Sequence, residues 1–235
     1  MHHGISPLMC NLTQAFFGRQ RREGLTVLSR HRHRGSYLAL VVSGGYEEAG
    51  DRGRHRVHAG DFVVHGGFEA HLNRYDATGA EVLNLALPRW MEPQSALMET
   101  SDPDTAVRLA ERDPREAVAY LVSNMRPRKS EIADWPDELA SAIANNPHLQ
   151  LGRWASQRGL ADATVSRGFR QVYGLSPSAY RAQMRGRTAW RRAMDCGKAL
   201  SELAIDAGFC DQSHMTRTVL LLTGQTPGGW RKHVK

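Results

Sequence analysis

The amino-acid sequence predicts an α+β protein of two domains, an N-terminal β-barrel with short helices followed by an all-α C-terminal domain. In residues 25–87 short apolar runs alternate with glycine-rich turns, which is typical of strands. From Pro88 onward the apolar spacing becomes helical. Residues 1–125 hold 14 basic against 15 acidic side chains, a net −1, whereas residues 126–235 hold 17 against 9, a net +8. A basic half joined to a near-neutral half indicates a polyanion-binding module fused to a second module.

Runs rich in apolar and β-branched residues predict four strands of the first domain, at 25–28, 37–42, 61–64 and 81–85. Two short helices are expected at 104–110 and 115–122, and their Ala, Val and Leu residues indicate a dimer or interdomain contact. Segment 124–130 is polar and broken by a proline. We therefore expect an N-terminal domain over 1–125, a linker over 126–135 and a C-terminal domain over 136–235.

A repeat of about 50 residues runs through the basic half. Small, turn-forming and aromatic residues of the first copy recur 49 or 50 positions later, namely Ala155 as Ala204, Gly159 as Gly208, Gly174 as Gly224, Pro177 as Pro227 and Tyr180 as Trp230. One extra residue therefore lies in the second copy, between Gly208 and Met215.

Each copy predicts a helix, a glycine turn and a second helix, which is the plan of a helix-turn-helix unit. The first helices are expected at 151–158 and 200–207, each followed by a glycine that tolerates a left-handed turn. Asp162 and Asp211 are expected to cap the second helices. Segment 178–196 is expected to be a long basic helix that joins the two units.

The runs 207–217 and 223–231 closely resemble the second helix-turn-helix unit of AraC/XylS-type transcription regulators, and segment 151–181 resembles the first. The resemblance covers about residues 136–233. It implies a sequence-specific transcription regulator that binds double-stranded DNA, acts with RNA polymerase and is not an enzyme. Gly168 lies inside the first recognition helix, where glycine is expected to cost about 1 kcal/mol relative to alanine.

The polar outer faces of the two second helices are the predicted reading surfaces, placed in successive major grooves about 34 Å apart. Glutamine suits adenine and arginine suits guanine in bidentate geometry. The predicted contact residues are Thr164, Ser166, Arg167 and Arg170 in the first unit and Gln212, Ser213, His214 and Arg217 in the second. Arg167 and Arg217 occupy equivalent repeat positions, so one or both are alternatively phosphate contacts.

Residues 25–87 resemble a cupin, the small β-barrel often found as the sensory domain of such regulators. His31-x-His33 matches the histidine pair of the first cupin motif, and Gly60 followed by His71 matches the register of the second. The glutamate expected shortly after His33 is absent, and Tyr37 lies near its place. This cupin-like barrel is therefore expected to bind an effector at His31, His33 and His71.

The nature of that effector stays open at this point. Three imidazoles suit a divalent metal such as Zn²⁺, Ni²⁺ or Fe²⁺. Alternatively, they line a pocket for a small organic molecule, or lie on the surface among neighbouring arginines. The remaining histidines of this half are expected to be ordinary strand or loop residues, and these are His55, His58 and His65.

Other features narrow the class of protein. No apolar run approaches the roughly 20 residues of a membrane helix, no secretion signal is recognisable, and three scattered cysteines suit a reducing compartment, so a cytoplasmic protein is expected. No catalytic motif is present. Two functions compete with DNA-dependent regulation, namely a metal-dependent cupin enzyme, against which the missing glutamate argues, and a protein adaptor, suggested by Leu220-Leu221-Leu222.

Overall fold

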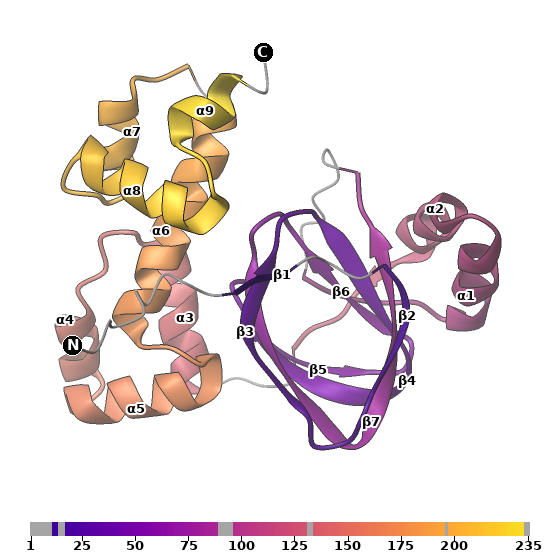
Figure 1. Ribbon diagram of the computed structural model, residues 1–235. Helices are drawn as coiled ribbons and strands as arrows, with labels where there is room; N and C mark the ends of the chain where they lie inside the picture. Colours follow the sequence, from indigo (N-terminus) through magenta and orange to yellow (C-terminus); the bar gives the residue numbers. More distant parts are fainter. Residues whose placement is uncertain (1–10, 14–16, 89–95, 131–133, 196, 233–235) are drawn as a thin grey trace, which may run out of the picture. The chain divides into compact units, whose positions relative to one another are not determined.

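A computed structural model describes residues 11–13, 17–88, 96–130, 134–195 and 197–232 (Figure 1). The chain divides into two compact units, an N-terminal unit of Leu12–Asp134 and a C-terminal unit that contains Trp135–Lys235. Within the described ranges, no helix is long and apolar enough to cross a membrane.

The N-terminal unit is built on one nine-stranded sheet, in which the pairings of β2 to β9 are antiparallel. Its strands are β1 (Asn11–Thr13), β2 (Gly18–Arg22), β3 (Val27–His33), β4 (Tyr37–Gly50), β5 (Gly53–His58), β6 (Asp61–His65), β7 (Ala70–Ala86), β8 (Leu97–Glu99) and β9 (Arg126–Pro127). The predicted strands at 37–42, 61–64 and 81–85 are confirmed as parts of β4, β6 and β7, although β4 and β7 are much longer than their apolar runs. The strand predicted at 25–28 is confirmed only from Val27, where β3 begins, because Leu25 lies in a turn with a φ of 61°.

The two long strands fold the sheet onto itself. They pair along their whole length, and register shifts between Val41 and Ser43 and between Gly44 and Tyr46 mark bulges, which bend strands. On one side of the bend they are flanked by β6 and β2, and on the other by β5 and β3. The result is two layers that close over a common interior, which together form a β-barrel (Figure 1).

Alternation along the strands separates two cores. Tyr37, Ala39 and Val41 pack into an inner cluster with residues of β5, β6 and β7. Leu38 and Leu40 point the other way and pack against α1 (Pro103–Arg112) and α2 (Pro114–Asn124). The two predicted helices are confirmed, but most of their apolar residues are buried in, or packed against, the core of this unit. Their composition therefore no longer argues for a dimer.

The boundary after residue 125 differs from the prediction. Arg126–Pro127 forms β9 against β8, and the amide of Arg128 donates to the Leu97 carbonyl at 3.1 Å. Arg128 also forms an ion pair with Asp61, and the Ser130 hydroxyl donates to the Arg54 carbonyl at 2.5 Å. Residues 126–130, expected to be linker, therefore belong to the barrel, because the polar side chains that suggest a linker find partners on its surface.

The C-terminal unit is entirely helical over its described residues. Its helices are α3 (Trp135–Asn145), α4 (Leu151–Gln157), α5 (Asp162–Tyr173), α6 (Pro177–Asp195), α7 (Leu200–Asp206), α8 (Gln212–Thr223) and α9 (Pro227–Lys232). Helices α4–α5 and α7–α8 form the two predicted helix-turn-helix units, and α6 joins them (Figure 1). Gly159 and Gly208 take the left-handed conformation at the two turns, with φ of 65° and 82°.

One predicted cap is confirmed and one is wrong. The Asp211 carboxylate accepts from the His214 amide at 2.7 Å and caps α8. In α5 the capping position is Ala161, whose side chain makes no such bond, and Asp162 is already the first helical residue. The extra residue of the second copy is the reason. With the shift of 50 that holds in the second helices, Asp211 corresponds to Ala161 rather than to Asp162.

Candidate functional site

Helix α5 is held by one face and exposes the other. Val165, Phe169 and Tyr173 are buried, and the ring of Phe169 stacks on Tyr173 with centroids 4.6 Å apart. Tyr180 of α6 completes this aromatic cluster, and the Tyr173 hydroxyl donates to Asp137 of α3 at 2.8 Å. Packing therefore fixes how α5 presents its polar side.

Helix α8 is held in the equivalent way in the second unit. Met215, Val219 and Leu222 are buried on one face. The indole N–H of Trp230 donates to the Thr223 hydroxyl at 2.7 Å and ties α9 to the end of α8. The two second helices are thus anchored by matching apolar faces, as the repeat predicts.

The eight predicted DNA contacts lie on the opposite faces of these helices. Seven of them are exposed, and Ser166 is half-buried. The His214 ring lies edge-on to Phe209 with centroids 5.2 Å apart, so its orientation is set by the turn before α8. The structure therefore makes the predicted side chains accessible from outside the unit.

The arginines of α6 are partly committed to holding the fold. Arg181 donates to the Leu149 carbonyl at 2.6 Å, and Arg185 donates to the Pro147 carbonyl at 2.6 Å. Arg231, the repeat equivalent of Arg181, donates to the Lys198 carbonyl at 2.9 Å. These arginines join the long helix α6, or α9, to the segment before each helix-turn-helix unit. The charge of the basic helix is therefore not all available to a polyanion.

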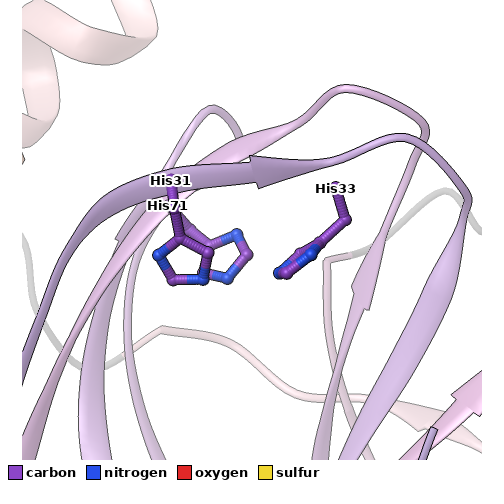
Figure 2. Close-up of side chains that lie close together, drawn as sticks. All are labelled: His31, His33 and His71. Carbon is purple, nitrogen blue, oxygen red and sulfur yellow. The ribbon is translucent and has the colours of Figure 1, made fainter. Parts of the chain in front are cut away.

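In the barrel the three predicted histidines lie together. His31 and His71 face each other across β3 and β7, with ring centroids 4.3 Å apart, and His33 lies two residues farther along β3 (Figure 2). The centroid of His33 is 5.0 Å from that of His31 and 5.5 Å from that of His71. One donor atom of each ring lies within 4.8 Å of the others.

Two further residues belong to this cluster, and no sequence motif indicates them. Glu48 and His65, together with His71, form a second group whose donor atoms lie within 4.8 Å of one another, and all three are buried. His65 stacks on Tyr37, its partner across β4 and β6, with centroids 4.5 Å apart. Glu48 accepts from the Asn73 amide at 3.0 Å across β4 and β7. Only the pairing of distant strands could have located them, because neither belongs to a recognisable motif.

Burial sets the protonation of the cluster. Desolvation lowers the pKa of the His65 and His71 imidazoles well below the usual value, and the neighbouring histidines lower it further. The pKa of His31 is lowered for the same first reason. These imidazoles are therefore neutral near pH 7, the form that binds metal ions. Burial raises the pKa of the Glu48 carboxyl to about 8.

A buried ion pair supports the histidine-bearing strands. Arg30 of β3 is paired with Asp51, and the other carboxylate oxygen of Asp51 accepts from the Ala70 amide at 3.0 Å. Arg30 precedes His31, and Ala70 precedes His71. The pair thus fixes the register in which these two histidines meet.

The N-terminal unit also contains a cavity away from the histidine cluster, between β7 and the helices α1 and α2. Its volume is about 750 Å³, within the usual range for small-molecule sites. Its wall is mainly apolar and includes Phe17, Leu83, Leu85, Leu87 and Val118, with Arg115 among the few charged residues. Sequence periodicity gave no sign of it.

Residues 154–233 match the protein family described as "Helix-turn-helix domain". The virulence regulon transcriptional activator VirF of Yersinia enterocolitica is 30% identical over 99 residues, which are 41% of this chain and 36% of that protein. The thermoregulatory protein LcrF of Yersinia pestis is 27% identical over 99 residues, with the same shares of the two chains. The chain thus spans little more than a third of the length of the curated relatives it matches.

Among solved structures, a probable AraC family transcriptional regulator from Rhodopseudomonas palustris is similar at 18% identity. The match covers 41% of this chain and 94% of that chain with a TM-score of 0.39.

Proposed function

We propose that the protein is a sequence-specific transcription regulator that binds double-stranded DNA and is controlled by an effector bound in its N-terminal unit. The proposal is supported by the C-terminal part of the chain, which matches a helix-turn-helix family and resembles AraC/XylS-type regulators. RNA polymerase is its expected partner, and the cytoplasm its expected compartment. The proposal concerns the whole protein, whereas the family match concerns residues 154–233.

The observation that carries the proposal is the pair of exposed polar helix faces in a basic unit. Helices α5 and α8 bury equivalent apolar faces, and their outer faces offer Arg167 and Arg217 at equivalent positions. The surplus positive charge of the chain lies in the half that contains them. A major groove admits an α-helix, and arginine and glutamine distinguish guanine and adenine there.

The test is DNA binding by the full chain at several salt concentrations, after binding-site selection from random duplexes. We expect two short boxes one helical turn apart, and log K that falls with log salt by about 0.9 per phosphate contact. Gln212→Ala should relax base preference in one box. Gln157→Ala, which removes the same amide from exposed α4, should leave that preference unchanged.

The arginine variants decide the alternative left open by the sequence. If Arg167 or Arg217 reads a base, its replacement by alanine costs about 1–3 kcal/mol at one base pair only. If it holds a phosphate, binding weakens on all sequences and the salt slope falls by about 1. A protein that does not bind duplex DNA at low salt, or binds with a flat salt response, contradicts the proposed function.

Two places in the N-terminal unit suit an effector, and they suit different chemistry. The histidine cluster offers neutral nitrogen donors to a metal ion, and the cavity beside α1 and α2 offers an apolar wall to an organic molecule. We propose that the effector changes DNA affinity by about 1–3 kcal/mol, the usual range of such coupling.

The buried Glu48 carboxyl bears on the alternative that this protein is a metal-dependent cupin enzyme. The sequence disfavours a cupin enzyme because the motif glutamate is missing, yet a buried carboxylate lies within the cluster. The proposal of a regulator rather than an enzyme therefore rests on the C-terminal domain alone.

A further inference from the structure

Two of the buried donors of the barrel, Glu48 and His65, are not among the residues that the sequence singles out. Glu48, His65 and His71 are 3%, 4% and 3% exposed, whereas His31 and His33 are only partly buried. Nε2 of His65 lies 3.5 Å from a carboxylate oxygen of Glu48. Two ligands of one tetrahedral ion at 2.0–2.2 Å are separated by about 3.4 Å, so this pair already has the spacing that such an ion requires.

Buried nitrogens of both histidines lack hydrogen-bond partners. Nε2 of His65 and Nδ1 of His71 have none among the described residues. The other nitrogen of His71 lies 3.2 Å from the Tyr37 hydroxyl, which holds the ring by one side. Such an arrangement is typical of a metal-binding histidine, whose second nitrogen is oriented by a neighbouring polar group. A buried polar atom without a partner otherwise costs about 1–3 kcal/mol.

The space beside these three residues selects an ion over an organic molecule. The wall of a cavity of about 10 Å³ includes Glu48, His65 and His71. Neither His31 nor His33 contributes to it, and its other charged residues are Asp51, Arg52 and Glu69. A cavity of this size holds about one water molecule. This cavity therefore has room for a single ion but not for an organic effector.

We propose that Glu48, His65 and His71 bind one divalent transition-metal ion of the class that accepts mixed nitrogen and oxygen ligands, such as Zn²⁺ or Co²⁺. Glu48 adds a carboxyl oxygen to the donor set, which the group of His31, His33 and His71 lacks. Asn73 orients that carboxylate, and Tyr37 orients His71. The inference deepens the proposed effector site, but it concerns the barrel alone.

The test uses the full chain with His2→Ala and His3→Ala, so that N-terminal imidazoles do not bind the probe. Co²⁺ is added, its visible absorption is followed, and Zn²⁺ is used as competitor. His71 belongs both to the proposed site and to the group that contains His31 and His33. Only variants of the other four residues therefore distinguish the two groups. Glu48→Gln and His65→Gln should each weaken Co²⁺ binding more than tenfold, and the matched variants His31→Gln and His33→Gln should change it less than threefold. The reverse pattern, or no Co²⁺ binding by the parent chain, overturns the proposal.

A second measurement needs no variant of the barrel. It therefore still tests the proposal if the Glu48→Gln variant does not fold. In the proton spectrum of the Co²⁺-loaded parent chain, ligand imidazoles give strongly shifted ring signals. Two shifted imidazoles support the site, and three indicate His31, His33 and His71 instead. Because neither measurement involves DNA, a failure here is distinguishable from a failure of the proposed DNA binding.

Discussion

Gly168 shows how one residue is fixed by a neighbour far away in sequence. It lies in the middle of α5, and a methyl group there would come within 2.4 Å of Cζ2 of Trp135. Helix propensity alone predicts that Gly168→Ala stabilises the protein by about 1 kcal/mol. We expect the opposite, a loss of about 1–3 kcal/mol, because the indole must move to admit the methyl group.

The measurement is denaturant unfolding followed by tryptophan fluorescence, which reports mainly on the C-terminal unit because four of the five tryptophans belong to it. Gly152→Ala is the matched control, since this helical glycine has no atom within 4 Å of the added methyl group. It should stabilise the unit by up to about 1 kcal/mol. If Gly168→Ala also stabilises it, the close packing of Trp135 is refuted.

At the scale of the element, the two copies of the repeat differ in how their second helices begin. Asp211 caps α8 through the His214 amide, whereas the equivalent position before α5 is Ala161. We expect Asp211→Ala to lower the free energy of unfolding of the C-terminal unit by about 1 kcal/mol. Ala161→Asp should raise it by a similar amount, because it supplies the missing acceptor.

The same fluorescence-detected unfolding measures both changes, and Asp162→Ala serves as the control. Asp162 follows the capping position, so its loss should remove only a favourable charge near the helix N-terminus, worth about 0.3–1 kcal/mol. A larger effect from Asp162→Ala than from Asp211→Ala would mean that Asp162 is the cap of α5 and that α5 begins one residue later than described.

At the scale of the whole molecule, the N-terminal unit needs the residues that look like a linker. A fragment of residues 12–125 lacks β9 and Arg128, so it loses backbone pairing with β8 and leaves Asp61 without this partner. We expect it to be less stable than a fragment of residues 12–134 by about 2 kcal/mol or more. Equal unfolding midpoints would support the boundary at residue 125.

The difference in stability between the two fragments should depend on pH, because it involves the Asp61 carboxyl. Burial raises the pKa of the Asp61 carboxyl, and Arg128 opposes the rise. A carboxyl whose folded pKa is raised favours the folded state when protonated, and this contribution is lost as the pH rises through the folded pKa. Without Arg128 the pKa of Asp61 rises further in the folded fragment, so that fragment loses more stability as the pH rises. The difference between the fragments should therefore be greatest near pH 7 and shrink toward pH about 4, which urea unfolding at several pH values measures.

The helical half was predictable because its determinants are local. Turn glycines and apolar spacing lie within one copy, and the second copy repeats them, so both helix-turn-helix units were predicted and the misplaced cap lies at the start of α5. In the barrel, His31 and His33 could be paired from their spacing of two. Glu48 and His65 could not be added, because their neighbours are set by the register of β4 with β6 and β7. The reason for Gly168 lies in Trp135, which no local pattern connects to it.

Both layers of the sheet contain part of β4 and part of β7, and this limits how early in folding either layer can form. Gly50 pairs with His71 and Tyr37 with Ala86, so neither layer can form before distant parts of the chain have met. Proteins dominated by such non-local pairings fold in milliseconds to seconds, whereas helical units with local contacts fold in microseconds to milliseconds. The N-terminal unit leaves the ribosome first, yet the helical unit can reach its fold sooner once it has been synthesised. The time from synthesis to a complete molecule is therefore set by the meeting of β4 and β7.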